Sequence, residues 1–84
     1  MSVFLIHFDR RGADETGLRE RFMPFELQPG LYMAESDETL SKVYHAAKRH
    51  LAADAWLFVA PLDRQPKFKG MADGALKWAR SRFR

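Results

Sequence analysis

Hydrophobic residues recur along this chain with two spacings, one typical of strands and one typical of helices. Residues 3–9, which end on Asp9, and residues 55–60 form largely apolar runs rich in β-branched and aromatic side chains, a composition typical of buried strands. We expect Pro61 to end the second of these strands. Residues 25–28 and 31–35 are two short runs on either side of a Pro-Gly pair, and they predict two further strands joined by a tight turn.

Two segments between these strands have the spacing of amphipathic helices. The first can begin at Asp14 or Thr16, and it should stop at Met23 because the following proline disfavours helical geometry there. The second can be capped by Ser36 or Asp37, where negative charge suits the helix dipole. Its apolar stripe comprises Leu40, Val43, Tyr44, Ala47 and Leu51.

A third helix is predicted from about Ala72 to Phe83, so the element order is β-α-β-β-α-β plus a terminal helix. This order predicts an α+β, ferredoxin-like split βαβ domain over residues 1–84, with two helices on one face of an antiparallel sheet. The other sheet face is also apolar, so the terminal helix, a second subunit or both must cover it. Because a chain of 84 residues has a marginal core, we expect a homodimer.

Charge is distributed unevenly along the chain. The formal net charge of +3 is the sum of −3 over residues 1–63 and +6 over residues 64–84. Such an asymmetry often marks a segment that faces a polyanion, although a basic helix face exposed to water gives the same pattern. The chain has no cysteine, which excludes disulfides and thiolate metal sites. It also has no stretch typical of a signal peptide or membrane span, so we expect a cytoplasmic protein with no membrane partner.

The basic C-terminal segment, residues 72–84, and the loop before it interleave cationic and aromatic side chains. Phosphate neutralisation combined with base stacking uses this combination, and without a base-reading motif it predicts sequence-independent binding of DNA or RNA. In the alternative, Trp78 and Phe83 pack on the sheet, with Leu76 and Ala79 on the same side, and the cations face water. The predicted nucleic-acid-binding residues are Arg10, Arg11, Lys67, Lys69, Lys77, Arg80, Arg82 and Arg84.

Asp9 is the first candidate for catalysis or metal binding, because it leaves a buried strand at its carboxyl end, where sites are commonly built. Alternatively, Asp9 caps a turn or pairs with Arg10 or Arg11. The three histidines, His7, His45 and His50, are weaker candidates; the spacing of the latter two does not place them together on a helix face.

The strand Phe4-Leu5-Ile6-His7-Phe8-Asp9 resembles the start of the CRISPR-associated Cas-two proteins and their small SinR-like relatives. The resemblance continues in residues 27–32, in residues 54–60 and in the late Trp78. It implies a homodimer in which Asp9 is the catalytic and metal-binding residue. Two such carboxylates across a two-fold axis would hold magnesium or manganese for phosphodiester cleavage.

Three classes of function are consistent with the sequence. The first is a Cas-two-like or SinR-like dimer that binds nucleic acid, with or without metal-dependent nuclease activity. The second is a non-catalytic interaction protein, such as a phage or mobile-element inhibitor that docks on a larger nucleic-acid-handling complex. The third is a toxin or antitoxin ribonuclease on the same fold. Fold alone does not decide among them.

Overall fold

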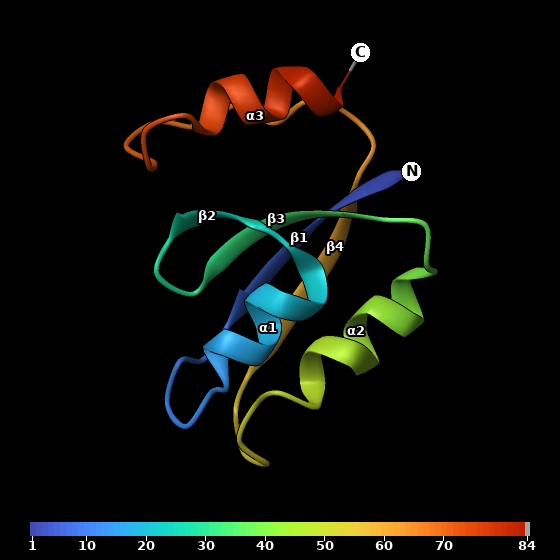
Figure 1. Cartoon of the computed structure of the whole chain (residues 1–84), viewed down its shortest axis with the longest axis vertical. Helices are drawn as coiled ribbons and strands as arrows, with labels where there is room; N and C mark the ends of the chain where they lie inside the picture. The colour runs from blue at the N-terminus through green and yellow to red at the C-terminus, as the bar shows by residue number, and fades with distance from the viewer. Residues whose placement is uncertain (84) are drawn as a thin grey trace.

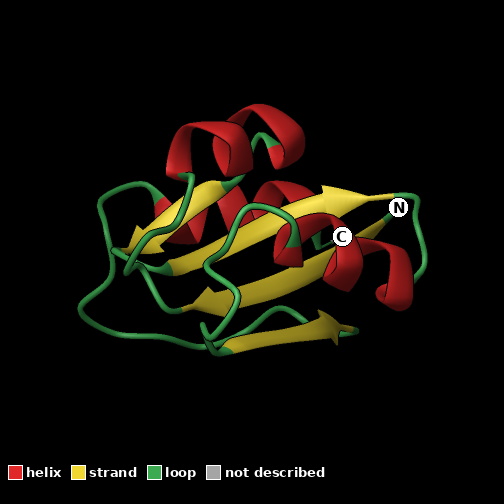
Figure 2. Cartoon of the chain, turned by 90° about the horizontal axis from the view of Figure 1, so that it is seen from below, coloured by secondary structure: helices red, strands yellow, loops and turns green. Residues whose placement is uncertain are grey.

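The structure is a computed structural model that describes residues 1–83. Within these residues four strands form one antiparallel sheet in the order β2-β3-β1-β4, shown side by side in Figure 2. The elements in chain order are β1 (Ser2–Phe8), α1 (Glu15–Phe22), β2 (Phe25–Gln28), β3 (Leu31–Ser36), α2 (Leu40–Lys48), β4 (Leu57–Leu62) and α3 (Ala75–Arg82). The predicted α+β class and the order βαββαβ with a terminal helix are confirmed. None of the helices in this part of the chain is long and apolar enough to cross a membrane.

The sheet is covered on both faces, by α1 and α2 on one side and by α3 on the other (Figure 1). Alternation along β1 explains this arrangement, because Phe4, Ile6 and Phe8 pack under α1 and α2 while Val3 faces α3. The terminal helix therefore covers part of the second apolar face, as one of the sequence alternatives anticipated. The buried residues on the α3 side are Val3, Leu27, Met33, Ala75 and Ala79.

Helix α1 begins and ends where the sequence predicts. The Asp14 carboxylate accepts a hydrogen bond from the amide of Gly17 at 3.0 Å, which caps the helix. Met23 adopts a left-handed conformation with φ of 48° directly before Pro24, and this ends the helix.

Helix α2 begins later than predicted, because Thr39 caps it in place of Ser36 or Asp37. The reason is that β3 extends through Ser36, where the residue pairs with Ser2 of β1. The Thr39 hydroxyl accepts a hydrogen bond from the amide of Lys42. Of the predicted apolar stripe, Val43 and Ala47 are buried, whereas Leu40 stays exposed beside the sheet edge.

Strand β4 continues through Pro61, so the expectation that this proline ends the strand is wrong. The amide of Asp9 donates to the carbonyl of Trp56. The backbone amides and carbonyls of the even-numbered residues 56–62 therefore point towards β1. The position of Pro61 then faces the outer edge of the sheet, where a missing N–H costs no ladder hydrogen bond.

Helix α3 is shorter than predicted and begins at Ala75. Gly74, with φ of 89°, precedes it, and the amide of Ala72 instead bonds the carbonyl of Leu27 on β2. The buried face of α3 consists of Ala75 and Ala79, whereas Leu76, which we expected on that face, is 45% exposed. Small side chains at the contact bring the helix close to the sheet.

Candidate nucleic-acid interface

Asp9 lies directly after β1, and its carboxylate is buried, with only 7% of the side chain exposed. Both carboxylate oxygens contact Arg11. The guanidinium Nε lies 3.1 Å from Oδ1 and 3.0 Å from Oδ2, and one terminal nitrogen lies 2.6 Å from Oδ2. The amide of Arg11 also donates to Oδ1 at 3.1 Å. Of the alternatives that the sequence leaves open, this geometry is the one in which Asp9 caps a turn and pairs with Arg11.

A tight turn over residues 10–13 holds Arg11 beside Asp9. The amide of Ala13 donates to the carbonyl of Arg10 at 3.1 Å, and Gly12 supplies the φ of 69° that this turn requires. The hydrogen bonds from Arg11, through its side chain first and then its amide, hold the pKa of Asp9 below its usual range. The same contact raises the pKa of Arg11. Asp9 is therefore ionised and neutralised by its neighbour at neutral pH.

This environment does not fit a divalent cation within one protomer. Magnesium and manganese prefer several oxygen ligands, but the guanidinium already occupies both oxygens of Asp9. No group of three or more histidines and carboxylates able to hold a metal ion is found in residues 1–83. The magnesium or manganese site that the resemblance implies stays a prediction, and it would require Arg11 to leave.

Arg10 is also held by a carboxylate. Its Nε donates to Glu15 at 3.1 Å, and Glu15 in turn lies 3.5 Å from a guanidinium nitrogen of Arg19. Arg10 and Arg11 are therefore neutralised by acids of their own segment, although both guanidinium groups are largely exposed.

A shallow groove of about 290 Å³ lies between α3 and the start of β2. Phe25 and Trp78 line it, with their ring centroids 6.1 Å apart and their planes inclined by 43°. Lys77 and Arg82, five positions apart on α3, add cationic groups to the same groove. The rest of the lining comes from Gly74 and Ser81.

Arg82 fixes the indole of Trp78. The guanidinium carbon lies 4.5 Å from the centroid of the Trp78 ring, a cation–π distance. The Nε of Arg82 donates to Glu35 of β3 at 2.7 Å, so the same side chain connects α3 to the sheet. Trp78 is therefore held half-buried, with part of its ring surface accessible from the groove.

The other predicted cations of this region lie at exposed positions, and among them only Lys77 lines the groove. Lys67 and Lys69 lie in the loop between β4 and α3, and Lys77 and Arg80 lie on the outer face of α3. None of these four forms an ion pair with a carboxylate of the described residues. Arg84, the remaining predicted contact, lies outside the described residues.

Chemically, this surface combines partly accessible aromatic rings with cations of which, among the described residues, only Arg82 is paired with a carboxylate. Aromatic rings stack on bases and the cations neutralise phosphates, so the combination suits single-stranded nucleic acid. The sequence singled out Trp78 and the cations but not Phe25 or Glu35. The signal that could have found Phe25 is the alternation with Leu27, which places both side chains on the α3 face of β2.

The histidines lie apart from this surface. The Nδ1 of His50, just after α2, lies 3.1 Å from the Asp14 carboxylate that caps α1. His7 is exposed on the α3 side of the sheet and meets the Trp56 ring edge-on at 4.8 Å. His45 lines a groove with Arg21, Lys42 and Arg49, outside the α3 region.

Comparison of the chain with protein-family models gives no match, and comparisons with curated proteins and with solved structures give none either.

Proposed function

We propose that this protein is a small domain of the ferredoxin-like split βαβ type that binds single-stranded nucleic acid without reading its sequence. The observation that carries the proposal is the groove of Phe25 and Trp78, with Lys77 and Arg82 beside the rings. A base stacked in this groove would leave its neighbouring phosphates near Lys77 and Arg82, the two cations that line it.

Electrostatics supports the same surface. Over residues 64–83, six basic side chains face a single acid, Asp73, and of the six only Arg82 has a carboxylate partner within the described chain. Solvent-exposed cations without such partners are available to neutralise phosphates and release counterions.

The test is the salt dependence of binding to a labelled single-stranded oligonucleotide. Replacing Lys77 and Arg80 together with glutamine should weaken binding and lower the slope of log affinity against log salt. The expected decrease is about 0.7 for each phosphate contact that is lost. The matched control replaces Lys48 and Arg49 with glutamine. These two residues are exposed at the end of α2, so their replacement removes the same charge far from the groove. Equal slopes for both double variants would contradict the proposal.

A second candidate function, a non-catalytic protein-interaction module, is favoured by a separate observation. Trp56 and Phe58 are 51% and 57% exposed on the sheet, which is high for large apolar side chains outside a contact surface. A protein partner and a nucleic acid would use different residues, so the two candidates are separable. Variants at Phe58 should leave oligonucleotide binding unchanged, and variants at Lys77 and Arg80 should affect it.

Metal-dependent phosphodiester cleavage through Asp9 remains the enzymatic alternative, in the manner of the Cas-two-like nucleases or of a toxin ribonuclease. The ion pair with Arg11 argues against it, because the carboxylate has no oxygen left for a cation in this conformation. A cleavage assay with magnesium or manganese tests this alternative separately from binding.

A further inference from the structure

The outer edge of β4 offers backbone groups to a further strand. Hydrogen bonds to β1 use the even-numbered residues of this segment, as the bond from the Asp9 amide to the Trp56 carbonyl shows. The amides and carbonyls of Leu57 and Val59 therefore point away from the sheet, together with the carbonyl of Pro61. Within residues 1–83 no strand pairs with this edge.

The opposite edge of the sheet differs in two respects. On β2 the carbonyl of Leu27 accepts a hydrogen bond from the amide of Ala72, so the segment before α3 occupies part of that edge. Strand β2 also carries Glu26, which lies 3.9 Å from a guanidinium nitrogen of Arg19. Residues 55–62 contain no charged side chain, in a chain of which 30% is charged. Charged residues normally protect exposed edges, and here only Pro61 does so.

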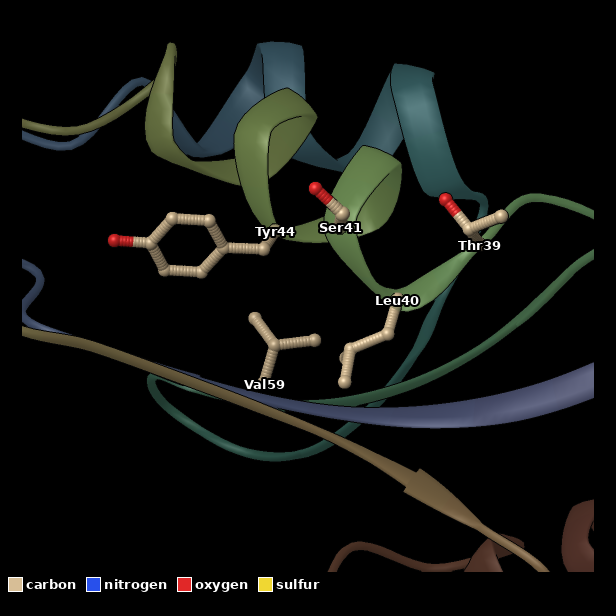
Figure 3. A pocket seen from close by; sticks show the side chains of 5 residues that line it. All are labelled: Thr39, Leu40, Ser41, Tyr44 and Val59. Atoms are coloured by element: carbon tan, nitrogen blue, oxygen red, sulfur yellow. The ribbon is translucent and has the colours of Figure 1, made fainter.

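An apolar hollow of about 520 Å³ runs beside this edge, between β4 and the start of α2. Figure 3 shows Leu40 extending from α2 towards the strand, the Tyr44 ring lying along the hollow, and Val59 rising from β4 below that ring. Thr39 and Ser41 complete the lining, so no charged side chain enters it. On the other face of the strand lie the exposed rings of Trp56 and Phe58.

We propose that this edge pairs with the same edge of a second copy of the chain, β4 against β4 in antiparallel orientation about a two-fold axis at Phe58. In this register Leu57 lies opposite the partner's Val59, so every outward amide of both residues meets a carbonyl. The two symmetric pairs give four hydrogen bonds and extend the sheet across both protomers.

A second copy presents an equally uncharged edge, and only the register centred on Phe58 pairs every outward amide and carbonyl of Leu57 and Val59. A shift that places Val59 opposite itself sets Leu57 against Pro61, and the Leu57 carbonyl then has no donor because proline has no N–H. A shift the other way sets Val59 opposite Ala55, whose amide already bonds the carbonyl of Ala52. In the favoured register the partner's Leu57 lies beside Val59 on the α2 side, where it brings an apolar side chain to the hollow. The two Phe58 rings pair directly on the other face.

The absence of native cysteine makes a crosslinking test direct. At the proposed axis, residue 58 of each copy forms a non-hydrogen-bonded pair with a Cα separation of about 4.5 Å, which suits a disulfide. We expect Phe58→Cys to form a covalent dimer under mild oxidation. The control is Pro61→Cys on the same exposed strand, where the two thiols would be six residues apart, or about 20 Å. Equal crosslinking of both variants would overturn the register.

A second variant tests the interface without relying on cysteine chemistry. Phe58→Lys sets two like charges directly opposite each other and should convert a dimer into a monomer in light scattering at micromolar concentration. Because Phe58 is largely exposed, circular dichroism should show an unchanged fold. A wild-type monomer, or a Phe58→Lys dimer, overturns the proposal. Oligonucleotide binding is measured independently, so failure of this inference leaves the proposed function standing.

Discussion

Arg11 holds both oxygens of the Asp9 carboxylate, and its amide donates to the same side chain. The contact joins the end of β1 to the turn that leads into α1. The residue that resembles a nuclease carboxylate is thus bound by the residue two positions after it. We interpret Asp9 as a structural residue that fixes this turn.

The stability of the protein should depend on Asp9 in a pH-dependent way. The pKa of Asp9 in the folded chain is below that of an unfolded aspartate, about 3.9, so the ion pair stabilises the fold above that pH. The contribution is lost as the pH falls through the lowered pKa. We expect Asp9→Asn to lower the thermal midpoint at pH 7, with the difference from wild type shrinking under more acidic conditions. A midpoint at pH 7 equal to that of wild type would contradict the structural role.

Cleavage assays should separate this role from catalysis. With magnesium or manganese present, we expect wild-type protein to leave single-stranded oligonucleotides uncut, because Arg11 occupies the carboxylate. Arg11→Gln removes the guanidinium from the Asp9 carboxylate, so this variant tests whether Arg11 is what keeps a metal ion away. Metal-dependent cleavage by wild type that Asp9→Asn abolishes, with an intact fold, would restore the enzymatic reading.

Gly17 of α1 leaves room for the contact between Asp14, which caps α1, and His50, which follows α2. A Cβ at this position would lie 2.6 Å from the His50 Nδ1 and would overlap the Asp14 carboxylate. Replacing a helical glycine with alanine usually stabilises a protein by about 1 kcal/mol. Here we expect Gly17→Ala to destabilise, as measured by chemical denaturation, because the Asp14 cap and its His50 contact must move. The exposed neighbour Thr16 supplies the control, since Thr16→Ala should have little effect.

Tyr32 carries a hydroxyl that is fully buried without a hydrogen-bond partner in the described residues. Burial also raises the pKa of Tyr32, so the group stays neutral. Because an unsatisfied buried hydroxyl costs free energy, Tyr32→Phe should leave the unfolding free energy unchanged or raise it by about 1 kcal/mol. Truncation of the ring that Tyr32 packs against, by Phe8→Ala, should cost about 3–5 kcal/mol. A loss of several kcal/mol for Tyr32→Phe would reveal a hydrogen bond that the hydroxyl makes in solution.

The order of elements was predictable because strands and helices leave local patterns. The cap at Asp14 and the end of α1 at Met23 follow from residues within one turn of each boundary. The start of α2 was misplaced because Ser36 pairs with Ser2 in the sheet, a contact that no local pattern contains. Pro61 was wrongly expected to end its strand. A strand tolerates proline where the backbone nitrogen faces the outer edge of the sheet, and the sequence alone does not show that β4 is an edge strand.

The candidate site was predictable only in its chemistry. The alternation of cations and aromatic residues pointed to Trp78 and its neighbours. Its meeting with Phe25, which lies 53 positions earlier in the sequence, depends on how α3 crosses the sheet. The pairing of Asp9 with Arg11 depends in the same way on a turn whose geometry Gly12 permits, and the sequence left it as one of several possibilities.

Fluorescence of Trp78 tests the central claim most directly. The chain has two tryptophans, so Trp56→Phe leaves Trp78 as the single reporter. On titration with a short single-stranded oligothymidylate, we predict that Trp78 emission is quenched as a base stacks in the groove. The quenching should follow the binding curve measured by the anisotropy of a labelled oligonucleotide and weaken as salt is raised. Binding by anisotropy with unchanged Trp78 emission, or no binding at low salt, would contradict the account.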